Sequence, residues 1–256
     1  RIPDKTRLKR AADSVFSLTC NNLRTAAASG WDFSSRWMRG RELYTTNTRN
    51  TVPVDLNCLV FNLQQTATKS QMLQMFGAVN KEALQADTNL ARTVFNRTFF
   101  NDRLGWFCDY NIDSGRVSDK PTLAGMFPLY FKLADKKSAA RVADFLRRNF
   151  LKEGGVVTTL QYTGQQWDAP NGWAPLQWIT VVGLENYGYH QLAKEIAIRW
   201  VNLNKKVFRE TGKLMEKYDV VNLKRKAGGG EYPSQDGFGW TNGVLLALLN
   251  RYDIRP

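Results

Sequence analysis

The chain is poor in the residues that build metal centres and nucleophilic triads. It has one histidine, His190, and three cysteines that form no CxxC pair. A zinc site needs several Cys or His ligands at short spacing, so no metal and no cofactor are predicted. Because no Ser or Cys elbow motif accompanies His190, we interpret it as structural rather than catalytic.

Long apolar runs are also missing. No segment contains the roughly 18 consecutive apolar residues that suggest a membrane-spanning helix, so no membrane span is expected. The chain has 256 residues, 43% of them hydrophobic, which is enough to bury a sizeable core. That length allows one large domain or two small ones. Because no linker divides the chain, we predict a single domain over residues 1–256.

Acidic residues are outnumbered: 36 Lys and Arg face 23 Asp and Glu, which gives a formal net charge of +13. Such an excess can mark a nucleic-acid-binding protein. Here the basic residues are dispersed, and no nucleic-acid-binding motif accompanies them. A solvated basic surface is therefore favoured, nucleic acid is not expected as a partner, and a polyanion-binding scaffold is the weakest alternative.

Periodicity predicts one helix after another. Apolar residues recur near helical spacing, and Pro53 precedes one run, where proline suits a first turn. The predicted helices are 6–24, 54–74, 88–100, 121–134, 138–150, 174–187, 191–208 and 238–251, with short extended pieces at 105–110 and 156–162. The predicted fold class is all-α, and loops on such a scaffold usually carry the function.

The first candidate segment is 28–37, Ala-Ser-Gly-Trp-Asp-Phe-Ser-Ser-Arg-Trp. Gly30 permits an unusual backbone torsion or a close approach of a ligand. Apolar walls from the two tryptophans would favour the neutral form of Asp32, which suits a general acid. Arg36 works against this, because a nearby cation favours the carboxylate. The competing interpretation of Asp32 is a helix cap beside two core tryptophans.

The second candidate segment is 164–175, Gly-Gln-Gln-Trp-Asp-Ala-Pro-Asn-Gly-Trp-Ala-Pro. Its tryptophans could stack on a ligand, while its Asp, Asn and Gln side chains offer donors and acceptors to a hydroxyl-rich molecule. Two plainer interpretations stay open: Asn171 with Gly172 reads as a turn, and Asp168 as a helix cap.

The third candidate combines 214–219, Leu-Met-Glu-Lys-Tyr-Asp, with the Gly-rich segment 228–242. It carries Glu216 and Glu231. Glycoside hydrolysis needs two carboxyl groups, one to protonate the leaving oxygen and one to activate water or to attack directly. Asp32 with either glutamate can fill these roles, and spacing does not choose between them. Glu216 could instead pair with a neighbouring lysine on a solvated surface.

Together these segments resemble the neutral-type trehalases of glycoside hydrolase family 37. Residues 166–175 look like that family's second signature, and 228–233 with 235–243 look like its Gly-rich C-terminal block. Residues 29–37 and 52–57 are also similar to family segments.

The resemblance implies an (α/α)6 toroid, of which this chain supplies roughly the second half, and hydrolysis of α,α-trehalose to two glucose molecules with inversion. It implies that Asp32 is the general acid and Glu216 the general base that activates water, with Glu231 as the reserve base. Substrate-binding residues are expected in the same segments: Gly30, Trp31, Arg36, Gln166, Trp167, Asp168, Asn171, Trp173, Glu231, Phe238 and Trp240.

Two parts of the family pattern are absent. No segment matches the first signature, a Pro-Gly-Gly-Arg-Phe-like stretch, or the Arg-Pro-Glu segment. Because these parts supply arginines and aromatic residues that grip the disaccharide, we expect the chain to need an N-terminal half and not to hydrolyse trehalose alone. The alternative is a non-catalytic trehalose- or glycan-binding paralogue. The sequence does not determine the compartment, although a periplasmic or secreted location is slightly favoured over a cytoplasmic one.

Overall fold

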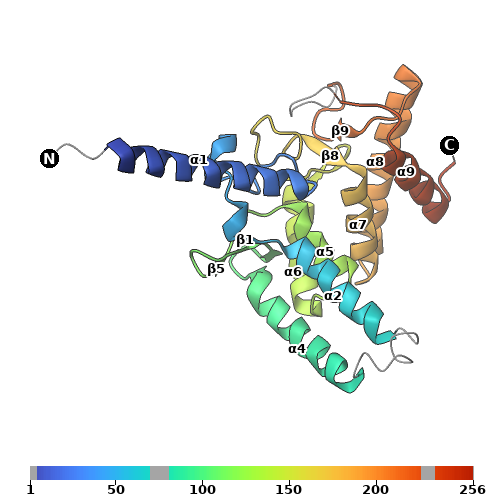
Figure 1. The fold of residues 1–256 in the computed structure, drawn as a ribbon. Coiled ribbons are helices and arrows are strands. Elements are labelled where there is room, and N and C mark those ends of the chain that lie inside the picture. The colour runs from blue at the N-terminus through green and yellow to red at the C-terminus, as the bar shows by residue number, and fades with distance from the viewer. Residues whose placement is uncertain (1–4, 70–80, 226–233, 256) are drawn as a thin grey trace.

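The structure is a computed structural model that describes residues 5–69, 81–225 and 234–255 (Figure 1). In these residues helices joined by loops dominate, which confirms the predicted all-α class. The α-helices are α1 (Lys5–Ala28), α2 (Val54–Lys69), α4 (Lys81–Phe99), α5 (Phe127–Tyr130), α6 (Lys136–Phe145), α7 (Ala174–Glu185), α8 (His190–Thr211) and α9 (Gly239–Tyr252). Shorter helical turns are η1 (Leu43–Thr45), η2 (Thr48–Asn50), η3 (Leu123–Met126) and η4 (Leu146–Phe150).

Two predicted helices are broken in the structure. The segment 121–134 forms η3 and the one-turn helix α5, because Pro128 has no N–H to donate inside a continuous helix and fits only a first turn. The segment 138–150 ends its α-helix at Phe145 and continues as the π-helical turn η4. The last five residues of the predicted helix 54–74 lie outside the described residues.

Short antiparallel strands join the loops, and the sequence patterns missed most of them. The strands are β1 (Thr51–Val52), β2 (Phe100–Asn101), β3 (Trp106–Phe107), β4 (Tyr110–Asn111), β5 (Arg116–Val117), β6 (Leu151–Lys152), β7 (Gly155–Val156), β8 (Asn171–Trp173) and β9 (Lys217–Asp219). They pair as β1-β4-β5, β2-β3, β6-β7 and β8-β9. The last pair sets Trp173 opposite Lys217, so the second and third candidate segments lie side by side.

Helix α7 is the centre of the core. It contacts α5 on one side and α8 and α9 on the other (Figure 1). A helix that is apolar on nearly all faces must be buried, and α7 buries Leu176, Val181 and Leu184. At Gly183 a Cβ would lie 3.1 Å from the backbone nitrogen of Tyr130. The glycine therefore allows α5 to pack close to α7.

The opposite edge of the molecule is more open. Helix α1 extends away from the rest of the chain, and α2 and α4 run together at another edge (Figure 1). Among the described helices, none is both long and apolar enough to cross a membrane. The described residues also contain no cluster of three or more His, Cys, Asp or Glu side chains that could hold a metal ion.

The core is packed so closely around Gly125 that it leaves no room for a side chain there. A Cβ at this position would overlap the indole nitrogen of Trp106 and the carbonyl of Phe107, which are both buried. We expect Gly125→Ala to lower the free energy of unfolding by about 1–3 kcal/mol, as overpacking does. Urea denaturation measures the change.

The matched control is Gly243→Ala in α9, where no atom lies within 4 Å of the added Cβ. This change should be neutral or stabilising, because Ala favours a helix over Gly by about 1 kcal/mol. Similar losses in the two variants would contradict the packing role of Gly125.

Candidate active site

The loop after α1 presents Asp32. Helix α1 ends at Ala28, and Gly30 then adopts a φ of +78°, which a residue with a side chain rarely adopts. The Ser29 hydroxyl accepts the N–H of Trp31 at 3.1 Å and steadies the turn. Asp32 is half-buried in this loop. It follows a helix end and does not cap a helix start, so the capping interpretation is wrong.

Trp31 and Trp37 are the apolar walls predicted for this loop, and both are buried. The side chain that lies between them is Arg36. Its guanidinium carbon is 4.6 Å from the ring centroid of Trp31 and 4.2 Å from that of Trp37. Stacking on two indole faces holds the cation in place.

The charge of Arg36 is balanced by two carboxylates. Asp109 accepts from Nε at 2.8 Å, and Asp55 accepts from both terminal nitrogens at 2.8 and 2.7 Å. Burial alone would lower the pKa of Arg36, but these charges and hydrogen bonds raise it. Burial would likewise raise the pKa of Asp55, and the charge of Arg36 outweighs it and lowers that pKa. The guanidinium is thus occupied within the protein; its predicted contact with substrate stays a prediction.

Asp168 joins the loop that carries Asp32 to the second candidate segment. It is fully buried. Its carboxylate accepts from the Ser34 hydroxyl at 2.9 Å and from the N–H and hydroxyl of Ser35 at 2.8 and 2.7 Å. The hydroxyls of Thr159, at 2.9 Å, and Thr163 also donate to it. Asp168 therefore anchors loops and does not cap a helix. Its contact with substrate stays a prediction.

Gln166 lies between Asp32 and the third candidate segment. Its Nε2 donates to the backbone carbonyl of Asp32 at 2.5 Å, and its Oε1 accepts from Lys217 Nζ at 3.1 Å. Its own carbonyl accepts from Asn171 Nδ2 at 3.0 Å and from the indole N–H of Trp173 at 3.1 Å. Asn171 and Gly172 lie in β8, so the turn interpretation is wrong.

Glu216 directly precedes β9 and is buried, with 3% of its surface exposed. Lys217 Nζ lies 2.7 Å from its Oε2. The indole N–H of Trp240 donates to its carbonyl at 3.3 Å. The pairing with a neighbouring lysine therefore exists, but it is inside the protein and not on a solvated surface.

The predicted tryptophans form a continuous row. The rings of Trp31 and Trp167 stack at 5.3 Å, and those of Trp167 and Trp173 stack at 3.9 Å with planes 2° apart. Trp240 meets Trp173 edge-on at 5.7 Å and packs on Phe238 at 4.8 Å. The first three rings are buried, whereas Trp240 is 37% exposed. The remaining predicted site residue, Glu231, lies outside the described residues.

Comparisons with known proteins identify the family of the chain. The model of the Trehalase family matches residues 4–253. The periplasmic trehalases of Salmonella newport (strain SL254) and Salmonella schwarzengrund (strain CVM19633) are 43% and 42% identical to the chain over 249 residues, 96% of the chain and 42% of each relative. The chain belongs to the trehalase family. It spans less than half the length of the curated relatives it matches.

Solved structures show the fold of this trehalase-family chain. The neutral trehalase Nth1 from Saccharomyces cerevisiae matches with a TM-score of 0.76 at 23% identity, covering 92% of this chain and 43% of that one. The GH63 mannosylglycerate hydrolase from Thermus thermophilus, in complex with glucose, matches with a TM-score of 0.57 at 17% identity, covering 82% of this chain and 49% of that one. The predicted (α/α)6 toroid class is confirmed.

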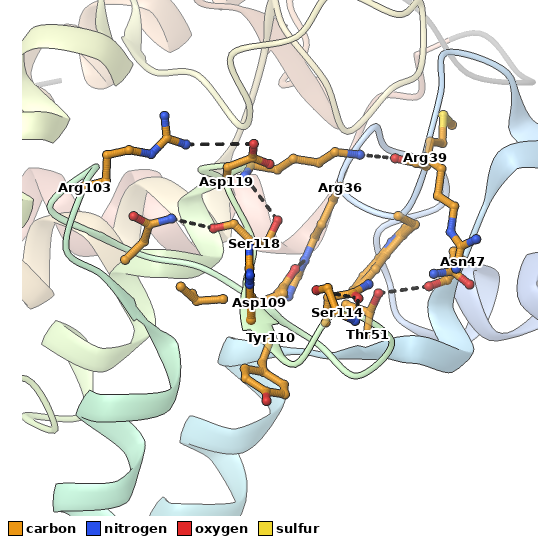
Figure 2. A pocket seen from close by; sticks show the side chains of 17 residues that line it. Arg36, Arg39, Asn47, Thr51, Arg103, Asp109, Tyr110, Ser114, Ser118 and Asp119 are labelled. Atoms are coloured by element: carbon orange, nitrogen blue, oxygen red, sulfur yellow. Dashed lines mark hydrogen bonds and ion pairs between the residues drawn. The ribbon is translucent and has the colours of Figure 1, made fainter.

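Arg36, Asp55 and Asp109 together form the Arg36 cluster. A polar cavity of about 570 Å³ lies beside this cluster (Figure 2). Arg39, Arg103, Asp109 and Asp119 are among its lining residues, and Arg103 approaches Asp119 at 3.9 Å. Neither Asp32 nor Glu216 lines it. The described residues that line this cavity thus include neither of the two carboxyl groups predicted for catalysis.

Sequence reasoning missed three residues that support this trehalase-family site. Asp55 lies in the segment 52–57, which resembled the family, but its pairing with Arg36 was not anticipated, nor was that of Asp109. Lys217 was considered only as a surface partner. A signal existed for the aspartates, because an arginine between core tryptophans needs buried counter-charges.

Because of the Arg36 cluster, we expect the free energy of unfolding to fall at acid pH. The folded chain holds the pKa of Asp55 below its ordinary value, so it binds fewer protons there than the unfolded chain does. This stabilisation is complete above about pH 4 and is lost as the pH falls through the lowered value. Asp55→Asn should lower the free energy of unfolding by about 3 kcal/mol at pH 7, because it unbalances a buried cation, and should weaken the dependence on acid pH.

Denaturation at pH 7 and pH 3 measures both effects. The control is Asp113→Asn, which removes an exposed partner of Arg39 and should change the stability by less than about 1 kcal/mol. A loss as small in Asp55→Asn would contradict the role of the cluster.

Proposed function

We propose that this chain supplies the two catalytic carboxyl groups of an enzyme that hydrolyses α,α-trehalose to two glucose molecules with inversion. Asp32 is the general acid and Glu216 the general base. The observation that carries the proposal is that Gln166 and Lys217 connect the Asp32 loop to Glu216 across the tryptophan row. The relatives named periplasmic trehalase support the same substrate and a periplasmic location.

The mechanism follows from two carboxyls on opposite sides of the glycosidic bond. Asp32 gives its proton to the glycosidic oxygen, which leaves as a glucose hydroxyl. Glu216 takes a proton from a water molecule, and that water attacks the anomeric carbon from the opposite face. Inversion requires the carboxyl groups to be about 6.5–9.5 Å apart, which leaves room for the water. The exposed face of Trp240 and the adjoining Phe238 suit the apolar face of a glucose ring.

The enzyme works with an N-terminal half that completes the toroid. Large apolar side chains are exposed, in the described part of the chain, on the neighbouring helices α2 and α4: Leu59 and Leu63 on α2, and Leu90 and Val94 on α4. Phe16 is also exposed, on α1, which extends away from them (Figure 1). Apolar surface that gathers over neighbouring helices, as on α2 and α4, is typical of an interface. The 42% share of the curated relatives' length that this chain covers supports the same conclusion.

The carboxyl roles predict a loss of turnover without a loss of binding. Asp32→Asn and Glu216→Gln, made in a form of the enzyme that hydrolyses trehalose, should each reduce kcat by at least about 10³-fold, because each removes a proton transfer that the transition state requires. Glucose release measures kcat, and calorimetry with trehalose measures binding.

Matched controls are Asp144→Asn and Glu210→Gln, which make the same chemical changes at exposed positions on α6 and α8. Both should keep wild-type turnover. Near-normal activity in Asp32→Asn or Glu216→Gln would show that the role assigned to that residue is wrong.

The need for an N-terminal half gives a second prediction. The purified 256-residue chain alone should release little glucose from trehalose. Without the N-terminal half, the apolar faces of its helices stay exposed and the substrate site is not enclosed. The chain fused behind the N-terminal part of the Salmonella newport relative should release glucose readily. Robust turnover by the chain alone would sink this part of the proposal.

A further inference from the structure

The connection between the two proposed catalytic segments is made by side chains that take no part in the proton transfers proposed above. We propose that Gln166 and Lys217 are positioning residues that form a bridge fixing the acid loop relative to the base. This inference rests on the proposed function of Asp32 and Glu216. It replaces the predicted role of Gln166 as a substrate ligand with a role in alignment.

The bridge consists of three consecutive hydrogen bonds. Gln166 Nε2 donates to the Asp32 carbonyl at 2.5 Å, and Lys217 Nζ donates to Gln166 Oε1 at 3.1 Å. The same ammonium donates to Glu216 Oε2 at 2.7 Å. Two side chains thus span the distance between the backbone of the acid and the carboxylate of the base.

Both bridge residues are held in fixed positions. Lys217 has no exposed surface and Gln166 has 2%. The ammonium of Lys217 lies 5.3 Å from the ring centroid of Trp173, its partner across the β8–β9 pair. The carbonyl of Gln166 is fixed by Asn171 and by the indole of Trp173. Rigid neighbours of this kind are what a precise catalytic geometry needs.

Lysine suits this position for a physical reason. A buried ammonium is costly unless it has hydrogen-bonding and charged partners, and Lys217 finds both in Gln166 and Glu216. The bridge therefore aligns the Asp32 loop with Glu216.

Lys217→Met is the direct test, because methionine keeps most of the volume and removes the charge and the donors. In a trehalose-hydrolysing form of the enzyme we expect kcat to fall about 100-fold with a much smaller change in KM, as a misplacement of about 1 Å can cause.

Gln166→Met tests the other half of the bridge. It breaks the two bridge bonds of Gln166 but leaves Lys217 beside Glu216, so kcat should fall with a much smaller change in KM. Lys205→Met and Gln191→Met are the controls; the ammonium of Lys205 bonds to the carbonyl of Arg255, and Gln191 is exposed on α8. Both should keep wild-type kcat and KM.

A double-mutant cycle completes the test. If the two residues act as one bridge, Gln166→Met should cost less in the Lys217→Met background than in the wild type. Wild-type kcat in Lys217→Met, a change confined to KM in that variant, or multiplicative losses in the cycle would each overturn the bridge.

The two proposals fail in different ways. If Asp32→Asn or Glu216→Gln keeps turnover, the proposed function fails and the bridge as an aligner of acid and base fails with it. If both lose turnover while Lys217→Met and Gln166→Met behave like their controls, only the bridge fails. Crystal structures of the wild type and Lys217→Met give a readout without turnover: unchanged positions of Glu216 and the Asp32 loop would also overturn it.

Discussion

The rest of the site depends on the hydrogen bonds that the buried carboxylate of Asp168 accepts from the loop that carries Asp32. It lies in the segment that also carries Gln166 and Trp167, and it accepts hydrogen bonds from Ser34 and Ser35, which closely follow Asp32. In a low-dielectric interior a carboxylate must be surrounded by donors, or its burial costs several kcal/mol. Because of that requirement, the loop that carries Asp32 packs against a segment more than a hundred residues later in the chain.

Charge balance in the interior explains how a chain of net charge +13 builds such a site. Arg36 is neutralised by Asp55 and Asp109, and Lys217 by Glu216. The described buried cations thus have carboxylate partners, as burial demands. Most of the other described basic side chains are at least partly exposed to water, which agrees with the dispersed basic residues of the sequence.

The sequence predicted the helices well because a helix repeats its pattern over many residues, as α7 and α8 do. It missed strands such as β8 and β9, since three residues are too few to show an alternating pattern. The partners of Arg36 also escaped prediction: Asp109 lies 73 positions away, and no local pattern pairs them. The residue pattern already offered Asp32 with Glu216 or Glu231, and the family resemblance favoured Glu216, whereas only the structure revealed that Lys217 is buried between Glu216 and Gln166.

The proposed acid and the proposed base are held in different ways. Gln166 binds the backbone carbonyl of Asp32, so the loop is fixed while the carboxyl group is not consumed by the contact. A general acid must be able to carry its proton, and a cation on its carboxyl would oppose that; the nearby Arg36 is directed to Asp55 and Asp109 instead. Glu216, in contrast, is held through its carboxylate, to which Lys217 Nζ donates at 2.7 Å. One connected set of hydrogen bonds thus fixes the backbone of one catalytic candidate and the side chain of the other.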